Sequence, residues 1–392
     1  MKKLKKITAF LLALTLVLAM TSCAQKQEEE HIHKIGVLVY DLKDEQVQAF
    51  REYLEGYIGE NFSDVDFLYS AGVTTEVEEM EFLNNAIAAG VEGVIAFNSF
   101  DLEQEVALCA SHGVYYLRPS STTAPEDFDK VADNPYFLGY FGPGNEMEYQ
   151  AGYDMGVYFA KEQISDSYFL LSGGAGTNVM HEQRAEGMLD ALQEAYGVQF
   201  DESSIYLASA SEPVSVEAGN LKVTVFPGYI GVPDVGEQAV AAFEKDPAGV
   251  VMSTIPVQAI ADSLGDASLG TVDCYTETNG ELFKNGNLKY LCGKYESIIG
   301  PAFAAMYNAV TGYSEDFRED GKAFAIQQGF WTSTDYQDFQ EKYELSSGIT
   351  LNAYSYEDLL EVCKAHNPNA TLDDLKGLAG AWDFDSAVQR RK

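Results

Sequence analysis

Short apolar runs alternate with amphipathic segments along the chain from Lys34 onward. Residues 34–40 (KIGVLVY) are almost continuously apolar, which is typical of a strand buried on both faces of a parallel sheet. The next segment, 44–60, carries apolar residues at helical spacing. By the same criteria, the pattern predicts helices at 76–90 and 101–113, and strands at 65–70, 91–99, 114–117 and 136–141.

The alternation starts again after a turn at 142–144. It predicts strands at 167–172, 221–226, 249–254, 271–275, 288–293 and 322–331. It predicts helices at 145–163, 181–197, 235–247, 256–265, 298–313, 334–344, 356–366 and 372–378. At the start of the first of these helices, Asn145 and Glu148 have the spacing of a capping box.

Strands that alternate with helices predict parallel sheets with helices on both faces. Because the alternation runs through two successive stretches, the chain is expected to be an α/β protein with two doubly wound lobes in tandem.

The first 22 residues have the pattern of a secretory signal. Lysines at the start precede a largely apolar run from Ile7 to Met20, which is too short for a comfortable membrane span. Cys23 follows in MTSC, which resembles a bacterial lipobox and implies cleavage before Cys23 and lipid attachment to its sulfur. The alternative is an ordinary signal peptide with an unrelated cysteine. A lipidated Cys23 would anchor the protein on the extracytoplasmic face of the cell membrane without spanning it.

Residues 23–33 are polar and aperiodic, and they are expected to form an acidic tether. His31 and His33 beside three glutamates could also bind a metal ion. The sequence shows no regular element that would hold them in a fixed geometry, so a solvated tether is favoured and no metal site is predicted.

The chain is strongly acidic, with a net charge of −36 that becomes −40 once the four lysines of the signal are removed. A chain of this charge repels nucleic acid, so no nucleic-acid partner is expected. At 46% hydrophobic and 12% aromatic residues it nevertheless has the composition of a folded protein, and the acidic residues are expected to cover its surface.

Motifs that would indicate an enzyme are missing from the sequence. There is no GxSxG, HExxH or Cys/His arrangement, and acidic pairs such as Glu78 and Glu79 lie on helix faces. The cysteines after Cys23 show no CxxC spacing; Cys274 and Cys292 each end a predicted strand, and the sequence leaves open whether they pair. We therefore expect no enzymatic activity and no cofactor.

The loop SGGAGTN at 172–178 joins a predicted strand to a predicted helix. A P-loop needs lysine directly after its last glycine, and here Thr177 follows Gly176. A GxGxxG loop would need a third glycine where Val179 stands. The glycines are instead expected to let a ligand approach the backbone at the carboxyl end of a strand, where open α/β sheets bind ligands.

Four segments in order, 33–42, 83–98, 173–188 and 273–312, together resemble the type 1 periplasmic binding proteins of the ribose-binding kind. The third contains GGAGTN…RAEGM, which is similar to that family's GxAGTSAxxRxxGF loop. The resemblance implies two Rossmann-like lobes that close over a ligand and are joined by three crossover segments. The crossovers are expected near 141–144, 292–295 and 321–328. Lobe 1 is expected to contain 34–141 and 295–321, and lobe 2 142–294 and 322–392 with a helical tail.

The resemblance also implies ligand-binding positions. Arg184 lies where the family has a ligand-binding arginine, and a planar guanidinium suits paired sugar hydroxyls. Tyr40 and Asp41 end the first strand and Asn98 ends the third, where polar and aromatic contacts are implied. Phe141 is one of several aromatic residues expected to stack on the ligand.

The sequence departs from the family at other positions. Thr254 stands where an asparagine is usual, Glu277 lies near the usual sugar-binding aspartate, and Lys294 replaces a glutamine. Arg118 is out of register with the usual Asp-Arg pair. Arg184 and Lys294 together would favour a ligand with a carboxylate or phosphate, or a nucleoside-like ring edge; alternatively, Glu277 neutralises one of them and the ligand is a neutral sugar.

These features predict a monomeric, extracytoplasmic solute-binding lipoprotein that traps a small polar ligand, in first place a sugar, and delivers it to the permease of a membrane ABC importer. Two alternatives stay open. One is a nucleoside-binding receptor of the basic-membrane-protein type, to which Lys294 after LKYLCG is similar. The other is a ligand sensor for a membrane signalling partner.

Overall fold

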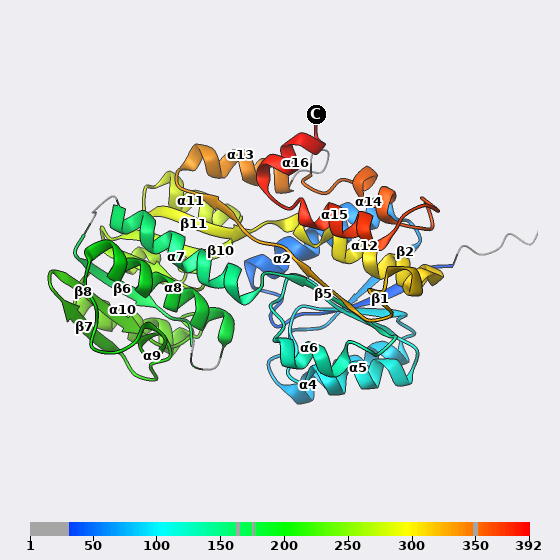
Figure 1. Cartoon of the computed structure of the whole chain (residues 1–392), viewed down its shortest axis with the longest axis horizontal. Coiled ribbons are helices and arrows are strands. Elements are labelled where there is room, and N and C mark those ends of the chain that lie inside the picture. Colours follow the sequence, from blue (N-terminus) through cyan, green and yellow to red (C-terminus); the bar gives the residue numbers. More distant parts are fainter. Residues whose placement is uncertain (1–30, 162–164, 175, 177, 348–351) are drawn as a thin grey trace, which may run out of the picture.

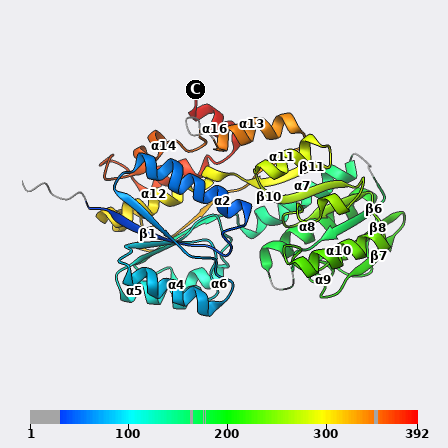
Figure 2. The same ribbon diagram turned by 180° about the vertical axis from the view of Figure 1, so that it is seen from behind.

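The chain forms two α/β lobes that lie side by side, each built on its own sheet (Figure 1). The computed structural model describes residues 31–161, 165–174, 176, 178–347 and 352–392. A view from behind shows the same two lobes and the segments that pass between them (Figure 2). The predicted fold class is confirmed. Across the described ranges, every helix is too short or too polar to cross a membrane.

The first sheet is wholly parallel, with the order β12-β5-β4-β3-β1-β2. Its strands are β1 (His33–Leu38), β2 (Val65–Tyr69), β3 (Gly93–Ala96), β4 (Tyr115–Arg118), β5 (Phe137–Gly142) and β12 (Phe324–Gln327). Most residues of the inner strands are fully buried, as the continuous apolar runs require for a sheet that is covered on both faces.

Helices cover both faces of this sheet (Figures 1 and 2). One face carries α4 (Glu76–Ala88), α5 (Leu102–Ser111) and α6 (Pro125–Val131). The opposite face carries α2 (Glu45–Arg51), the π-helical turn η1 (Glu52–Ile58), α3 (Gly59–Asn61), η4 (Glu296–Ile299), α12 (Gly300–Asn308), η5 (Ala309–Tyr313) and η6 (Ser314–Phe317).

The second sheet has the order β13-β11-β10-β9-β6-β8-β7, in which only the two edge strands β13 and β7 run antiparallel. Its strands are β6 (Ser167–Leu171), β7 (Val214–Ala218), β8 (Leu221–Phe226), β9 (Val250–Ser253), β10 (Ser268–Cys274), β11 (Leu288–Lys294) and β13 (Trp331–Ser333). Its helices are α7 (Asn145–Lys161), α8 (Val179–Tyr196), α9 (Ser204–Ala208), α10 (Pro233–Lys245), η3 (Ala261–Ser263), α11 (Glu277–Lys284) and α13 (Tyr336–Ser347).

Three crossovers join the lobes, between β5 and α7, between β11 and η4, and between β12 and β13. The first two lie where they were expected. The third follows β12 and is formed by 328–330, later than the expected 321–328. Of the segment 322–392 that was assigned to lobe 2, β12 pairs with β5 in the first sheet and β13 pairs with β11 in the second.

Two sequence predictions were wrong in detail. The segment 322–331 is two strands in different sheets rather than one strand. The helix predicted at 256–265 is reduced to the single turn η3, because hydroxyl groups bind the backbone at its start: Ser253 Oγ and Thr271 Oγ1 donate to the Ile255 carbonyl at 2.6 and 2.7 Å.

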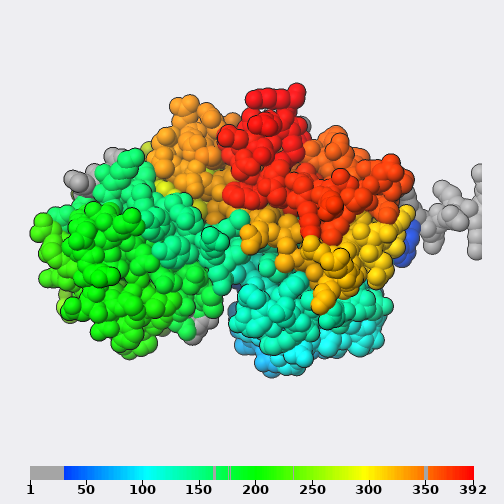
Figure 3. All heavy atoms as spheres, viewed as in Figure 1, coloured from blue at the N-terminus to red at the C-terminus, as the bar shows by residue number. Residues whose placement is uncertain are grey.

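The C-terminal tail, 352–392, covers the top of the molecule in Figure 3, where it extends over the side on which the crossovers lie. It contains α14 (Tyr356–Val362), α15 (Leu372–Gly380) and α16 (Phe384–Arg390). The Trp382 carbonyl accepts hydrogen bonds from Tyr295 Oη and Trp331 Nε1, both at 2.8 Å. Since Tyr295 lies in one crossover and Trp331 directly follows another, the tail holds two crossovers together.

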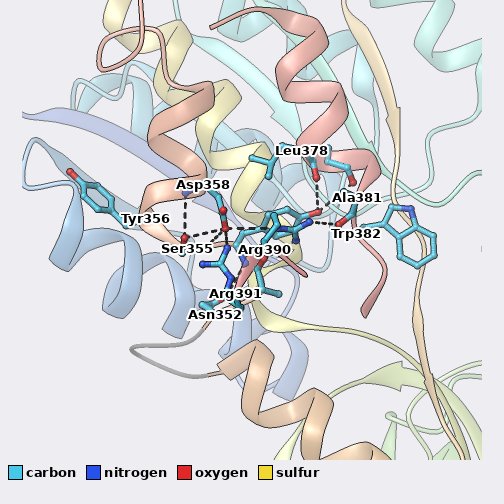
Figure 4. A network of polar contacts seen from close by, with 12 residues as sticks. Asn352, Ser355, Tyr356, Asp358, Leu378, Ala381, Trp382, Arg390 and Arg391 are labelled. Carbon is cyan, nitrogen blue, oxygen red and sulfur yellow. Dashed lines mark hydrogen bonds and ion pairs between the residues drawn. The ribbon is translucent and has the colours of Figure 1, made fainter. Parts of the chain in front are cut away.

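A polar network holds the tail itself (Figure 4). Asp358 accepts hydrogen bonds from the backbone and hydroxyl of Ser355, and it pairs with the guanidinium of Arg391. Arg390 donates to the carbonyls of Ala381 and Ala353 at 2.6 and 2.8 Å. These bonds fasten the last helix to the chain that precedes and follows α15.

The four cysteines after Cys23 are buried free thiols. Cys274 and Cys292 lie on neighbouring strands, as their predicted pairing would need, but they are out of register. Cys274 is opposite Lys294, and Cys292 is opposite Val272. The disulfide that the sequence left open is therefore not formed in this structure.

Candidate ligand site between the lobes

The two lobes contact each other through loops at the carboxyl ends of their strands. Lys294 Nζ, at the end of β11, donates to the Ser120 carbonyl after β4 at 2.6 Å. Thr278 Oγ1 on α11 donates to Glu45 Oε1 on α2 at 2.6 Å. Figure 3 shows a notch between the two lobes on the side opposite the C-terminal tail. Ligands of open α/β sheets bind at such strand ends, so the interlobe region is the candidate site.

A buried ion pair occupies the side of the site that belongs to lobe 2. Arg184 Nε on α8 donates to Glu148 Oε2 on α7 at 2.6 Å, and Arg184 Nη1 donates to the Thr254 carbonyl at 2.8 Å. The Arg184 side chain is 6% exposed and that of Glu148 is fully buried. The pair is possible because α7 and α8 pack backbone to backbone: a Cβ on Gly152 would overlap the Arg184 carbonyl.

The sequence predicted that Asn145 and Glu148 form a capping box at the start of α7, and that prediction was wrong. Helix α7 begins at Asn145, and the Glu148 amide donates to the Gly144 carbonyl, as in an ordinary first turn. The Glu148 carboxylate binds Arg184 and also accepts from Thr122 Oγ1 of lobe 1 at 3.1 Å. It is therefore an interlobe group rather than part of a capping box.

Lys294 is buried beside this pair. Burial lowers the pKa of its ammonium group to about 8, with Arg184 and Arg118 acting in the same direction, while Glu148 opposes the shift. Arg118, at the end of β4, donates from Nη1 to Thr123 Oγ1. At this end of the site, Lys294 therefore has Arg184, Arg118 and the Glu148 carboxylate among its charged neighbours.

The opposite end of the site is acidic. Asp273, the penultimate residue of β10, accepts hydrogen bonds from Asn279 Nδ2 at 2.6 Å and from Gln258 Nε2 at 2.5 Å. Burial raises the pKa of the Asp273 carboxyl to about 7, and the negative charge of Asp44 in lobe 1 adds to the shift, while the two amides oppose it. Asp44 caps α2, and burial raises the pKa of its carboxyl as well.

The structure places three of the predicted residues at the edge of the site in lobe 1. Tyr40 is partly buried and hydrogen bonded to Asp44, and Tyr229 of lobe 2 lies close enough to influence its hydroxyl. Asn98 Nδ2 donates to Glu79 Oε1 at 3.0 Å, which leaves Asn98 Oδ1 buried without a partner. Asp41 is exposed and accepts from the Lys43 amide.

Three other predicted residues do not present a side-chain polar or aromatic group to the site. Phe141 is fully buried in lobe 1 and packs edge to face on Phe324, so the expected stacking on a ligand is not supported. The Thr254 hydroxyl donates to the Leu171 carbonyl, and only the Thr254 main chain contacts Arg184. Glu277 is exposed in the first turn of α11, and the carboxylate that neutralises Arg184 is Glu148 instead.

In the glycine loop after β6, Gly173 packs closely on lobe 2, and the expected approach of a ligand to this loop stays a prediction. Gly173 has a φ of +64°, and a Cβ there would lie 2.8 Å from Thr254 Oγ1. Its carbonyl accepts from His181 Nδ1 at 2.7 Å; burial and the charge of Arg184 lower the pKa of that imidazole to about 3. The glycine therefore permits close packing on the end of β9. Ala175 and Thr177 lie outside the described residues.

Buried polar atoms without a hydrogen-bond partner gather at this interface. In the described part of the chain, seven of the eleven such side-chain atoms belong to a strand end, to the loop or crossover after it, or to the first turn of the next helix: Glu45 Oε2, Asn98 Oδ1, Arg118 Nε, Ser120 Oγ, Gln258 Oε1, Asn279 Oδ1 and Gln328 Oε1. Buried polar atoms are rarely left unpaired in folded proteins. These atoms can therefore form further hydrogen bonds with a bound polar molecule.

Sequence reasoning missed most of these groups. Ser120, Gln258, Asn279 and Gln328 are uncharged and occur in loops or helix starts, where polar residues are common. The available signal for Ser120, Gln258 and Asn279 was their position a few residues after predicted buried strands, whereas Gln328 lay within the strand predicted at 322–331. Among the described residues, the one group of side chains whose atoms could jointly hold a metal ion, His31, His33 and Glu92, lies elsewhere.

Comparison with known proteins identifies the class of fold. No protein-family profile and no curated protein sequence matches the chain. It is similar to the solved structure of an Actinobacillus succinogenes ABC transporter periplasmic solute-binding protein with bound D-allose, at 13% identity, with a TM-score of 0.60 over 79% of this chain and 99% of that one. A Bacillus halodurans ABC transporter solute-binding protein with bound myo-inositol matches at 14% identity, with a TM-score of 0.58 over 80% and 98%.

The periplasmic binding protein component of the arabinose ABC transporter from a Shewanella species matches at 14% identity, with a TM-score of 0.56 over 79% of this chain and 94% of that one. The chain therefore has the fold of the type 1 periplasmic binding proteins, as the sequence resemblance predicted. These neighbours are substrate-binding transport proteins and not enzymes. At this identity the similarity establishes the fold, and the ligand has to be argued from the site.

Proposed function

We propose that this protein is an extracytoplasmic solute-binding lipoprotein that captures a small polyhydroxylated ligand, a sugar or a related polyol, between its lobes and delivers it to an ABC importer. The observation that carries the proposal is the set of unpaired buried oxygen and nitrogen atoms at the strand ends of both lobes. Hydroxyl groups both donate and accept hydrogen bonds, so a polyol can satisfy acceptors such as Asn279 Oδ1 and donors such as Arg118 Nε at once.

The charges in the site favour a neutral ligand over an anionic one. Glu148 already neutralises Arg184, and Lys294 donates to the Ser120 carbonyl of lobe 1. At the other end, Asp273 holds its proton to near neutral pH. The sugars in the structural neighbours agree with this, since D-allose, myo-inositol and arabinofuranose are uncharged.

A thermal-shift screen of residues 24–392 tests the proposal. Pentoses, hexoses, inositols, nucleosides and sugar phosphates are added one at a time, and a ligand at 100 times its Kd stabilises the native state by about 2.7 kcal/mol. We expect a neutral sugar or inositol to raise the melting temperature. Gln258→Ala should reduce this shift, and Gln340→Ala on the exposed face of α13 should not. A response confined to nucleosides or phosphates would overturn the proposed ligand class in favour of the nucleoside-receptor alternative.

Membrane anchoring is proposed through Cys23, which lies outside the described residues. Replacing Cys23 with alanine removes the sulfur that would carry the lipid, so the protein is expected to move from the membrane fraction to the soluble extracytoplasmic fraction. Fractionation of cells that express the two forms measures this. If Cys23→Ala remains membrane-bound, the lipobox interpretation is wrong.

A further inference from the structure

A cluster of three potential metal ligands lies at the start of β1. His31 and His33 are two residues apart in extended chain, so their side chains lie on the same side. Glu92 directly precedes β3, the strand that pairs with β1. The Glu92 amide donates to the Lys34 carbonyl at 2.8 Å, which fixes the carboxylate beside the two imidazoles.

The three side chains converge on one point. His31 Nε2 lies 2.8 Å from Glu92 Oε1, and His33 Nδ1 lies 2.8 Å from Glu92 Oε2. One ligating atom from each residue lies within 4.8 Å of the other two. The two rings meet edge to face, with centroids 4.6 Å apart, so both nitrogens reach the same carboxylate without steric conflict.

The chemistry of these donors selects a class of ion. Two imidazole nitrogens and one carboxylate suit zinc and its first-row neighbours, and this set is found with an open fourth position in many zinc sites. Calcium and magnesium require mostly oxygen ligands, which this group does not supply. Neighbouring groups hold the site in place: the His33 amide donates to the Asp64 carbonyl, and the Tyr307 ring packs edge to face on the His33 ring.

We propose that His31, His33 and Glu92 bind one divalent transition-metal ion, zinc in first place, at the junction between the tether and the first lobe. The sequence favoured a solvated tether because it offered no rigid partner for the histidines. Glu92, held by the β1–β3 pairing, is that partner. The site lies at the amino end of β1, away from the ligand site at the carboxyl ends of the strands, and it does not depend on the proposed function.

Calorimetric titration of the full chain in detergent with zinc chloride tests this site. We expect one zinc ion per chain to bind with the highest affinity. His33→Ala and Glu92→Gln should each weaken this binding by at least about 100-fold, the upper end of the effect of losing an outer-shell partner. His112→Ala removes another exposed histidine at the end of α5 and should leave the affinity unchanged.

Cobalt(II) provides a second readout that does not depend on the titration. Its visible absorption spectrum distinguishes tetrahedral nitrogen and oxygen coordination from the hydrated ion, so the spectrum of the wild type should change on binding and that of His31→Ala should not. His31 is mostly exposed, so this variant is expected to fold. If the wild type and the three site variants bind zinc with equal affinity, the ion binds to surface carboxylates and the proposal is wrong. The proposal is also wrong if the wild type binds no zinc.

Discussion

Replacing Arg184 with alanine is expected to destabilise the folded protein by about 3–5 kcal/mol. The reason is the carboxylate that remains: Glu148 is fully buried, and Arg184 is the cation with which it forms an ion pair. Urea unfolding of the wild type and the variant measures the difference. A loss below about 1 kcal/mol, the value of an exposed pair, would show that solvent reaches Glu148 and that the site is more open than its burial indicates.

A double variant separates the buried charge from the rest of the effect. In Arg184→Met with Glu148→Gln no charge is left uncompensated, so most of the stability is expected to return. Ligand binding by the double variant is expected to be weaker than that of the wild type, because the ion pair between Arg184 and Glu148 on the lobe 2 side of the site is missing. The pair Lys222–Asp246, with both side chains about one third exposed, is a control, and Lys222→Met should cost about 0–1 kcal/mol.

This result would also revise the expectation from sequence alone. The family resemblance implies that Arg184 contacts the ligand, and the loss of such a contact would weaken binding by about 1–3 kcal/mol. In the structure its Nε and Nη1 atoms are already bonded to Glu148 and Thr254. The larger expected effect of its loss therefore falls on the free energy of unfolding.

The stability of the wild type is expected to fall, relative to Asp273→Asn, as the pH rises from about 4 to about 7. The pKa of the buried Asp273 carboxyl is raised from 3.8 to about 7, so between these values the native state holds a proton that the unfolded state has lost. Unfolding then releases a proton, and stability decreases with rising pH across this window. Asparagine resembles the protonated carboxyl and has no proton to lose.

Melting temperatures of the two proteins at pH 4, 5, 6, 7 and 8 test this. The difference between them should grow up to about pH 7 and then level off. Asp41→Asn, in an exposed loop after β1, is the control and should give a curve parallel to that of the wild type. Parallel curves for Asp273→Asn as well would mean that Asp273 is ionised throughout, and the acidic end of the site would then carry a full charge.

The alternation of strands and helices was predictable because it depends on local pattern. The strand at 34–40 and the helices α4, α5 and α8 were predicted correctly, because the spacing of their apolar residues agrees with the faces that the structure buries. The segment 322–331 was predicted wrongly as one strand, because nothing in the local sequence shows that the chain leaves one sheet and enters the other at Gly329. This break is associated with a tertiary contact, since the Trp382 ring packs against Gly329.

The site was predictable in part for the same reason. Arg184 and Lys294 lie at strand ends and helix starts that the pattern had already located, and the structure brings both beside the interlobe surface. Glu148 and Asp273 were missed, because an acidic residue in a first helical turn or at the end of a strand has a common local explanation. Their role depends on partners in the other lobe or on burial, and neither can be read from spacing.

The order in which the parts of lobe 1 are synthesised has a consequence for how the molecule assembles. In the chain, the edge strand β12 follows all of lobe 2 except β13 and α13, and the tail follows all of it, yet β12 pairs with β5 and the tail packs on α12. A chain made from the amino terminus must therefore leave the β5 edge unpaired until β12 is available, and the first lobe stays incomplete until the tail has been made. We infer that the first lobe is completed after the second, although most of its strands are made first.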